Sequence, residues 1–301
     1  MLTNNQISIA WKDLNVSVKS LFGKNETTIL SGISGEFYEK SLNVLMGASG
    51  SGKSKLLKCL NASNNYIISS ESKIYVNKNV TNIRKCFIYQ NQSQRLMTGL
   101  TVSQALTYSS KLKNPIQYND QKVDHKKIVS DIMQELLISD IKDNKIDNCS
   151  GGQIKRLSIG LELTSVCKPY LLFIDEPTTG LDTHSAIMVI SCLKQLSRNH
   201  NMSIIISIHQ PNNELYQMFD TIYVLAKGGQ TLYSGFTNNL YQFITDNQIE
   251  CNKNQFPLDM LMKLSYNGND IPNINNNKQT KITNNINNNL ILMKSQSVGI
   301  Q

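Results

Sequence analysis

A glycine-rich segment carries the clearest chemical signature of the chain. It matches the pattern G-x-x-x-x-G-K-[ST] and consists of Gly47, Ala48, Ser49, Gly50, Ser51, Gly52, Lys53 and Ser54. Glycines lack a Cβ atom, so the backbone of such a loop wraps closely around phosphate groups. The segment lies between an apolar run, Leu42–Met46, and a predicted helix, Lys53–Leu60. This context favours a phosphate-binding loop over an ordinary Gly/Ser turn with an unrelated lysine.

The residues at the end of this loop would each contribute different chemistry. The first turn of the following helix directs free backbone N–H groups at an anion. The Lys53 ammonium would reach the β- and γ-phosphates of a nucleotide, and the Ser54 hydroxyl is placed for Mg²⁺. The loop therefore predicts binding of a nucleoside triphosphate together with magnesium.

Two adjacent carboxylates, Asp175 and Glu176, follow a second apolar run, Leu171–Ile174. Such a run is typical of a buried parallel strand, and ligands of open α/β sheets bind at the carboxyl ends of the strands. Asp175 would hold Mg²⁺ through water, and Glu176 would orient or deprotonate an attacking water. Acidic residues are also common at ordinary strand ends, so the pair gains its meaning from the phosphate loop.

A second glycine-containing turn precedes a predicted helix and consists of Ser150, Gly151, Gly152 and Gln153. A flexible turn at a helix N-terminus is a second candidate anion site. Taken alone, the turn is better explained by a serine N-cap with glycines that permit a tight bend.

The elements that must position these residues alternate between strands and helices. Strands are predicted over 7–18, 28–37, 42–46, 170–174 and 203–208, and helices over 53–60, 123–138 and 184–198. This alternation predicts a mostly parallel sheet covered by helices. The stretch 95–148 is helix-rich and is predicted to be an inserted subdomain, with a capping box at Thr101–Gln104.

The last part of the chain differs in composition from the rest. Nine of the residues between 273 and 289 are asparagine: 273, 275, 276, 277, 284, 285, 287, 288 and 289. We expect this Asn-rich tail, 266–301, to be disordered and assign it no structure.

The overall composition excludes several classes of protein. No stretch approaches the roughly 18 apolar residues of a membrane-spanning helix, and the N-terminus lacks the pattern of a signal peptide. The six cysteines contain no C-x-x-C pair, which disfavours a zinc ribbon or a disulfide framework. The net charge of +8 arises without any block of basic residues, which favours a diffuse surface charge over a nucleic-acid site.

The order of the motifs resembles the nucleotide-binding domain of ABC transporters. The segments occur in the family's order: the phosphate loop, Gln90, 150–153, Asp175-Glu176, 179–182 and 208–211. The chain is most similar to the G (White-type) subfamily. That similarity rests on 28–35, 100–102, 155–162, 207–211 and 251–259, and the resemblance covers roughly residues 7–265.

The resemblance implies a fold and a set of roles. The fold would be an α/β P-loop NTPase core of the ABC type, a mostly parallel sheet with helices on both faces, an antiparallel β subdomain and the inserted helical subdomain. Gln90 would contact Mg²⁺ and water, Glu176 would be the catalytic base and His209 would contact the γ-phosphate. Ser150 and Gly152 would contact the nucleotide of a second protomer, and Asp182 would lie at the dimer interface.

The chain departs from the family pattern at several points, two of which bear directly on function. Val16 falls near the position of the aromatic residue that stacks on adenine, so this stacking is either absent or supplied by Trp11 or Phe22. In addition, chains of the G subfamily continue into about six spanning helices, whereas this sequence ends after the Asn-rich tail.

From these patterns we expect a cassette, 1–265, that binds ATP and Mg²⁺ and hydrolyses ATP to power transport. Its partners would be a second nucleotide-binding domain, identical or different, and a transmembrane domain, with no nucleic acid. It would lie at the cytosolic face of a membrane. The alternatives are an ABC ATPase with a role outside transport and a truncated half-transporter that only binds nucleotide.

Overall fold

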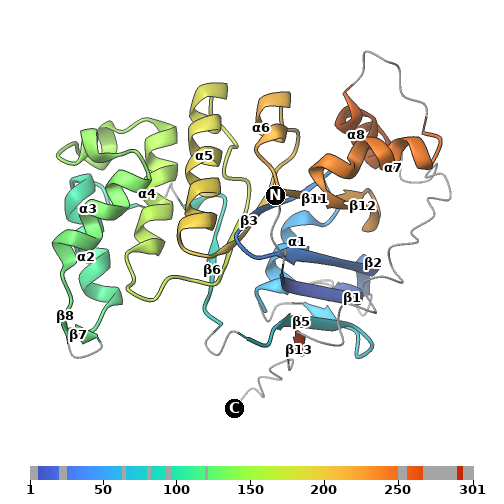
Figure 1. The fold of residues 1–301 in the computed structure, drawn as a ribbon, viewed down its shortest axis with the longest axis horizontal. Helices are drawn as coiled ribbons and strands as arrows, with labels where there is room; N and C mark the ends of the chain where they lie inside the picture. Colours follow the sequence, from blue (N-terminus) through green and yellow to red (C-terminus); the bar gives the residue numbers. More distant parts are fainter. Residues whose placement is uncertain are drawn as a thin grey trace.

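The computed structural model describes residues 6–19, 26–62, 66–79, 83–92, 96–118, 121–249, 256–266 and 290–293. Two large sheets, a two-stranded hairpin and a group of helices make up this part of the chain (Figure 1). Among these residues, no helix combines the length and the apolar character that a bilayer-spanning segment needs.

The central sheet has six strands in the order β12-β11-β3-β10-β9-β6. The strands are β3 (Ser41–Gly47), β6 (Lys85–Ile88), β9 (Leu171–Ile174), β10 (Ser203–Ser207), β11 (Thr221–Ala226) and β12 (Gln230–Phe236). All neighbouring pairs are parallel except β11 and β12. Four of its strands, β3, β9, β10 and β11, are buried along their whole length, as strands covered on both faces must be.

A second sheet is antiparallel and lies beside the first (Figure 1). Its strands are β1 (Ile7–Lys19), β2 (Glu26–Tyr38), β4 (Ile67–Ile68), β5 (Lys73–Asn77) and β13 (Leu290–Leu292). The strand order is β13-β5-β1-β2, so the long strand β1 pairs with β2 on one edge and with β5 on the other, and β4 also pairs with β1.

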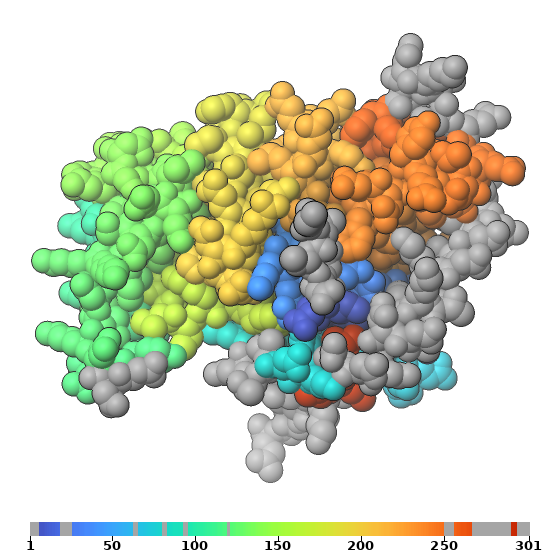
Figure 2. Space-filling view, in the orientation of Figure 1, coloured from blue at the N-terminus to red at the C-terminus, as the bar shows by residue number. Residues whose placement is uncertain are grey.

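The helices complete the chain. They are α1 (Lys53–Leu60), α2 (Val102–Lys113), α3 (His125–Glu135), α4 (Gly151–Leu163), α5 (Thr183–Asn199), α6 (Asn213–Gln217), α7 (Leu240–Asp246) and α8 (Pro257–Tyr266). Short 3₁₀ turns occur at Ser139–Ile141, Ile146–Asn148 and Thr237–Asn239, and a small hairpin joins β7 (Gln117–Tyr118) to β8 (Gln121–Lys122). Figure 2 shows the α2–α4 region at one end of the molecule and the α7–α8 region at the other.

Alternation along the central strands divides the core into two layers. In β10, for example, Ile204 and Ile206 belong to the cluster that includes α5, whereas Ile205 belongs to the cluster that includes α1 and the antiparallel sheet. Successive side chains of a strand point to opposite faces, so one buried strand supplies both layers. The predicted fold class is therefore confirmed: a mostly parallel sheet with both faces covered, and an antiparallel sheet beside it.

The predicted helical insertion is built from α2 and α3, and α4 packs against both. Thr101 begins α2 with the predicted capping box, in which Thr101 accepts from the Gln104 N–H and the Gln104 side chain reaches back. Gly160 of α4 permits the close approach of Leu136, the C-cap residue of α3. A Cβ at Gly160 would lie 2.8 Å from Leu136 Cδ1.

Trp11 is not available to stack on a nucleotide base, so one of the alternatives from the sequence is wrong. Its side chain is fully buried between Phe37 and Tyr223, with ring centroids 5.1 and 5.0 Å away. Val16 is also fully buried, and Phe22 lies outside the described residues.

The structure also differs from the expectation at two points of the tail. Tyr266 is the last residue of α8, and Leu290–Leu292 form β13, which pairs antiparallel with β5. These residues have regular structure where none was expected. The asparagine-rich stretch between them lies outside the described residues.

Candidate functional site

The phosphate loop connects β3 to α1 and adopts a conformation that requires glycine. Gly47, Gly50 and Gly52 have φ angles of 147, 79 and 100°. A Cβ at Gly47 would lie 2.2 Å from the Leu225 carbonyl oxygen, and one at Gly52 would lie 2.6 Å from Leu30 Cδ2. The sequence pattern of this loop is therefore dictated by its backbone path.

The start of α1 presents polar groups that a phosphate would satisfy. Gly52 is the N-cap residue, and no side chain caps the helix. Ser51 is fully buried, and its Oγ has no hydrogen-bond partner among the described residues. Buried polar atoms without partners are rare, and a bound anion supplies partners for both groups. The loop thus fits the triphosphate that its sequence predicts.

Lys53 extends into the loop rather than into solvent. Its side chain is buried, and Nζ donates hydrogen bonds to the carbonyl oxygens of Gly47 and Ala48 at 2.9 and 3.0 Å. Burial lowers the pKa of Lys53, while the nearby carboxylates of Glu176 and Asp175 act in the opposite direction. The loop therefore holds an ammonium group at its centre.

Asp175, directly after β9, links three segments. Its Oδ1 accepts hydrogen bonds from Ser54 Oγ at 2.9 Å and from Ser207 Oγ at 2.6 Å. Ser207 Oγ also accepts from the Glu176 N–H at 2.9 Å. The parallel register that pairs Ile206 with Ile174 brings Ser207 beside the two carboxylates.

The oxygen atoms of this cluster suit magnesium. Mg²⁺ in nucleotide sites is held by one or two protein oxygens together with phosphate oxygens and water. The Ser54 hydroxyl and the Asp175 carboxylate, joined by a hydrogen bond, form such a set next to the phosphate loop. Among the described residues, no group of three or more His, Cys, Asp or Glu side chains forms a metal site made of protein ligands alone.

The Glu176 carboxylate contacts the two remaining predicted side chains, Gln90 and His209. Its Oε2 accepts hydrogen bonds from Gln90 Nε2 at 2.7 Å and from Thr179 Oγ1 at 2.8 Å. Its Oε1 lies 2.6 Å from His209 Nε2, and His209 Nδ1 lies 3.3 Å from Lys53 Nζ. The backbone of Glu176 has a φ of 50°, a left-handed conformation that is uncommon outside glycine.

The Ser150 turn caps α4. Ser150 Oγ accepts from the Gln153 N–H at 3.3 Å, and the Gln153 side chain accepts from the Ser150 N–H at 2.9 Å. Gly152 packs closely against α5, where a Cβ would lie 2.9 Å from Ser185 Cβ. The N-cap interpretation is therefore confirmed, and it leaves Ser150 exposed at the surface.

Asp182 caps the neighbouring helix, α5. It accepts from the N–H and the hydroxyl of Ser185 at 2.9 and 2.7 Å, and these hydrogen bonds lower its pKa. Asp182 and the Ser150 turn thus belong to one exposed surface region.

The predicted site residues therefore fall into two groups. The phosphate loop and the side chains of Gln90, Asp175, Glu176 and His209 come together. The Ser150 turn makes no described contact with that loop, and Figure 1 shows α5 between α4 and α1.

Sequence reasoning gave no role to three residues that contact the first group: Ser207, Thr179 and Lys155. Lys155 Nζ donates to the Gln90 carbonyl oxygen at 2.8 Å. Ser207 had a detectable signal, since it is a hydroxyl at the end of an otherwise apolar run, Ile204–Ile206.

Comparisons with known proteins agree with these observations. A family model described as ABC transporter matches residues 30–179, and one described as ABC-2 type transporter matches 209–290. The solved structure of cbiO1 from Clostridium perfringens, part of the ABC transporter complex cbiONQ, superposes with a TM-score of 0.64. It is 20% identical, over 81% of this chain and 94% of that chain, and so supports the fold.

Several curated relatives carry the same family name. ABC transporter G family member 11 of Arabidopsis thaliana is 34% identical over 85% of this chain and 36% of its own length. ABC transporter G family member 1 of Dictyostelium discoideum is 32% identical over 86% of this chain and 34% of its own length. The chain thus spans about a third of the length of these relatives. It contains an ATP-binding cassette, and it belongs to the G subfamily of the ABC transporter family.

Proposed function

We propose that this chain binds and hydrolyses ATP and thereby powers transport through a transmembrane partner. One observation carries the proposal: Lys53, Ser54, Gln90, Asp175, Glu176 and His209 converge around the phosphate loop. A cation, oxygen ligands for Mg²⁺ and an acidic group beside one phosphate cradle are groups that phosphoryl transfer uses, and the His209 imidazole lies next to them.

Binding would rest on the loop and on the first turn of α1. The free N–H groups of that turn would contact the phosphates, and Lys53 would exchange its backbone carbonyl partners for phosphate oxygens. Ser54, Asp175 and Gln90 would hold Mg²⁺, which when bound would neutralise charge on the β- and γ-phosphates.

Hydrolysis would depend on Glu176. Its carboxylate would orient a water for attack on the γ-phosphorus and would accept a proton from it. Gln90 would help to position that water, since its amide already contacts Glu176. His209, between Glu176 and Lys53, would contact the γ-phosphate.

A complete site would need a second cassette. The exposed Ser150 turn lies apart from the loop of its own chain, and it presents a helix N-terminus with a hydroxyl group. In a head-to-tail dimer, Ser150–Gln153 of each chain would contact the γ-phosphate bound by the other, and Asp182 would lie at the interface. Homodimers and heterodimers both fit this arrangement.

The remaining partners are proposed from the relatives, which are named as transporters. The cassette would act at the cytosolic face of a membrane, attached through a transmembrane domain. Nucleic acid is not an expected ligand.

Calorimetry with Mg·ATP, phosphate release and analytical ultracentrifugation of the full chain test the proposal. We expect the wild-type protein to bind and hydrolyse ATP. Glu176→Gln should retain binding, lose about 10²- to 10⁴-fold in turnover and dimerise in Mg·ATP. A chain that fails to bind Mg·ATP, or a Glu176→Gln variant that remains monomeric in it, would contradict the proposal.

A further inference from the structure

Helix α4 contacts the Gln90 loop at two points. Lys155 Nζ donates to the Gln90 carbonyl oxygen at 2.8 Å, and Glu162 Oε1 accepts from Gln92 Nε2 at 2.9 Å. Residues seven apart lie on the same side of a helix, separated by two turns. One face of α4 therefore holds both ends of the short segment that carries Gln90.

The Gln92 side chain transmits the second contact to the backbone of the loop. While its Nε2 donates to Glu162, its Oε1 accepts from the Tyr89 N–H at 3.2 Å. The Gln92 N–H in turn donates to the Tyr89 carbonyl oxygen at 3.0 Å. Glu162 thus orients the amide that closes the turn containing Gln90.

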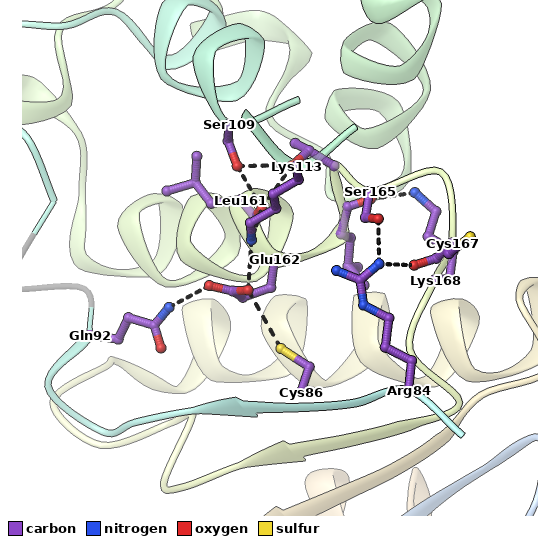
Figure 3. Close-up of polar contacts among 12 residues, drawn as sticks. Arg84, Cys86, Gln92, Ser109, Lys113, Leu161, Glu162, Ser165, Cys167 and Lys168 are labelled. Atoms are coloured by element: carbon purple, nitrogen blue, oxygen red, sulfur yellow. Dashed lines mark hydrogen bonds and ion pairs between the residues drawn. The ribbon is translucent and has the colours of Figure 1, made fainter. Parts of the chain in front are cut away.

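Glu162 is itself fixed by groups from two other elements (Figure 3). Its Oε2 accepts from Lys113 Nζ of α2 at 2.7 Å and from Cys86 Sγ of β6 at 3.5 Å. Burial, and then the Glu162 charge, raise the pKa of Cys86 to about 12, so the thiol keeps its proton and remains a donor. The carboxylate therefore has a defined orientation before it contacts Gln92.

These contacts matter because the loop borders open space. Gln90, Gln92 and Glu162 line a cavity of about 580 Å³, and Tyr89 is 53% exposed, although its ring packs on Phe87 at a centroid distance of 4.7 Å. Besides the Gln90–Glu176 hydrogen bond, the polar contacts with α4 are therefore the main described polar contacts that hold the segment 90–92.

We propose that Lys155 and Glu162 are positioning residues that fix the Gln90 loop to α4. Because Ser150 begins the same helix, the glutamine at one nucleotide and the serine turn directed at the partner's nucleotide move together. This inference rests on the proposed function, which supplies the roles of Gln90 and Ser150. The two residues would thereby link the two composite sites of a dimer.

Amide hydrogen exchange of the full chain without nucleotide tests the contacts directly. In Lys155→Met and Glu162→Met, the amides of Tyr89 and Gln92 should exchange about tenfold faster than in the wild-type protein. Glu162→Gln keeps an acceptor oxygen for Gln92 and should restore most of the protection. Unchanged exchange in both methionine variants would overturn the proposal.

Glu135→Met is the matched control. Glu135 also lies in the helical region, forms an ion pair with His200 at 2.9 Å, and has the same 26% side-chain exposure as Glu162. It should lower stability comparably but leave the exchange of Tyr89 and Gln92 unchanged. Faster exchange of those amides in this control would indicate a general loss of stability and would also overturn the proposal.

Kinetics test the positioning role. Both methionine variants should lower kcat about 10- to 100-fold, the scale expected for small misplacements of a catalytic group, with a much smaller loss of Mg·ATP affinity. In a Gln90→Ala background the same substitutions should have no further effect, because they act through Gln90. Independent, additive losses would overturn the role. If the wild-type chain fails to hydrolyse ATP, the proposed function is wrong. Hydrogen exchange alone then tests whether Lys155 and Glu162 fix the Gln90 loop to α4.

Discussion

His209 Nε2 lies 2.6 Å from Glu176 Oε1, so the candidate base and the candidate γ-phosphate contact form one unit. The other ring nitrogen, Nδ1, faces the Lys53 ammonium at 3.3 Å. An ammonium group only donates hydrogen bonds, so Nδ1 is the acceptor and the proton of a neutral ring is assigned to Nε2. The imidazole therefore connects the phosphate-binding lysine to the carboxylate that would orient water.

Replacing His209 should separate binding from turnover. In His209→Ala, Glu176 loses its Oε1 partner and the candidate contact to the γ-phosphate is removed, whereas the phosphate loop stays intact. We expect kcat to fall about 10²- to 10³-fold, with a much smaller change in Mg·ATP affinity. Phosphate release and calorimetry measure the two quantities. A variant with normal kcat would show that His209 has no part in hydrolysis.

Local motifs made the phosphate loop and the caps predictable from sequence. The glycines of the loop are required by its own backbone angles, and Thr101 and Ser150 cap helices through residues three positions away. Such features depend on neighbours in the chain, so their spacing alone identifies them.

Contacts that depend on how distant strands pair could not be predicted from the sequence. Ser207 reaches Asp175 only because β10 pairs with β9 in one register. Likewise, alternation places Trp11 on the same face of β1 as Ile9, but only packing against Tyr223 of the distant strand β11 shows that this face is the core. For β13, the surrounding composition concealed a short apolar run, Leu290–Leu292, whose partner β5 is distant in the chain.

Ser207 should prove to be a residue of the site rather than of the core. Ser207→Ala would leave the Glu176 N–H without its partner and remove one donor from Asp175. The expected cost is about 1–3 kcal/mol of stability, together with a clear loss of kcat. Urea unfolding and phosphate release measure these effects.

Ser203→Ala provides the comparison, because Ser203 lies at the other end of the same strand. Its buried hydroxyl accepts from Ser8 Oγ at 2.8 Å and from Asn43 Nδ2 at 3.2 Å. This variant should lose similar stability and keep its kcat. Equal kinetic losses in the two serine variants would argue against a specific role for Ser207.

Gly47 and Gly50 of the phosphate loop should respond differently to alanine. Gly47→Ala places a Cβ 2.2 Å from the Leu225 carbonyl oxygen and should destabilise the fold by about 1–3 kcal/mol or more, as overpacking does. Gly50→Ala meets no atom within 4 Å, so its cost should be the left-handed backbone alone, about 1–2 kcal/mol. Urea unfolding separates the two.

Gly32→Ala is the control that shows whether Gly50→Ala affects nucleotide binding specifically. Gly32 also has a positive φ, 59°, and open space around its Cβ position, but it lies on β2 outside the phosphate loop. Gly50→Ala should weaken Mg·ATP binding in calorimetry, while Gly32→Ala should not. Equal affinities in the two variants would show that nucleotide does not approach Gly50.

Titration of Lys85 should make the free energy of unfolding rise with pH in the alkaline range. Its Nζ donates to the Leu60 carbonyl oxygen at 3.3 Å and lies 3.2 Å from Met293 Sδ, and burial lowers its pKa from 10.5 to about 8. Between these two pH values the unfolded chain binds more protons than the folded protein, so this group adds stability as pH rises. The full effect is about 3 kcal/mol, absent below pH 8 and complete above 10.5.

Lys85→Met removes the titrating group and makes the effect measurable. The free energy of unfolding should rise with pH in the wild-type protein relative to this variant, because the other titrating groups are common to both. Urea unfolding at pH 7 and pH 9.5 tests the expectation, and Lys73→Met, at an exposed lysine, serves as the comparison. A wild-type-minus-variant difference that stays constant across this range would show that Lys85 titrates normally in the folded protein.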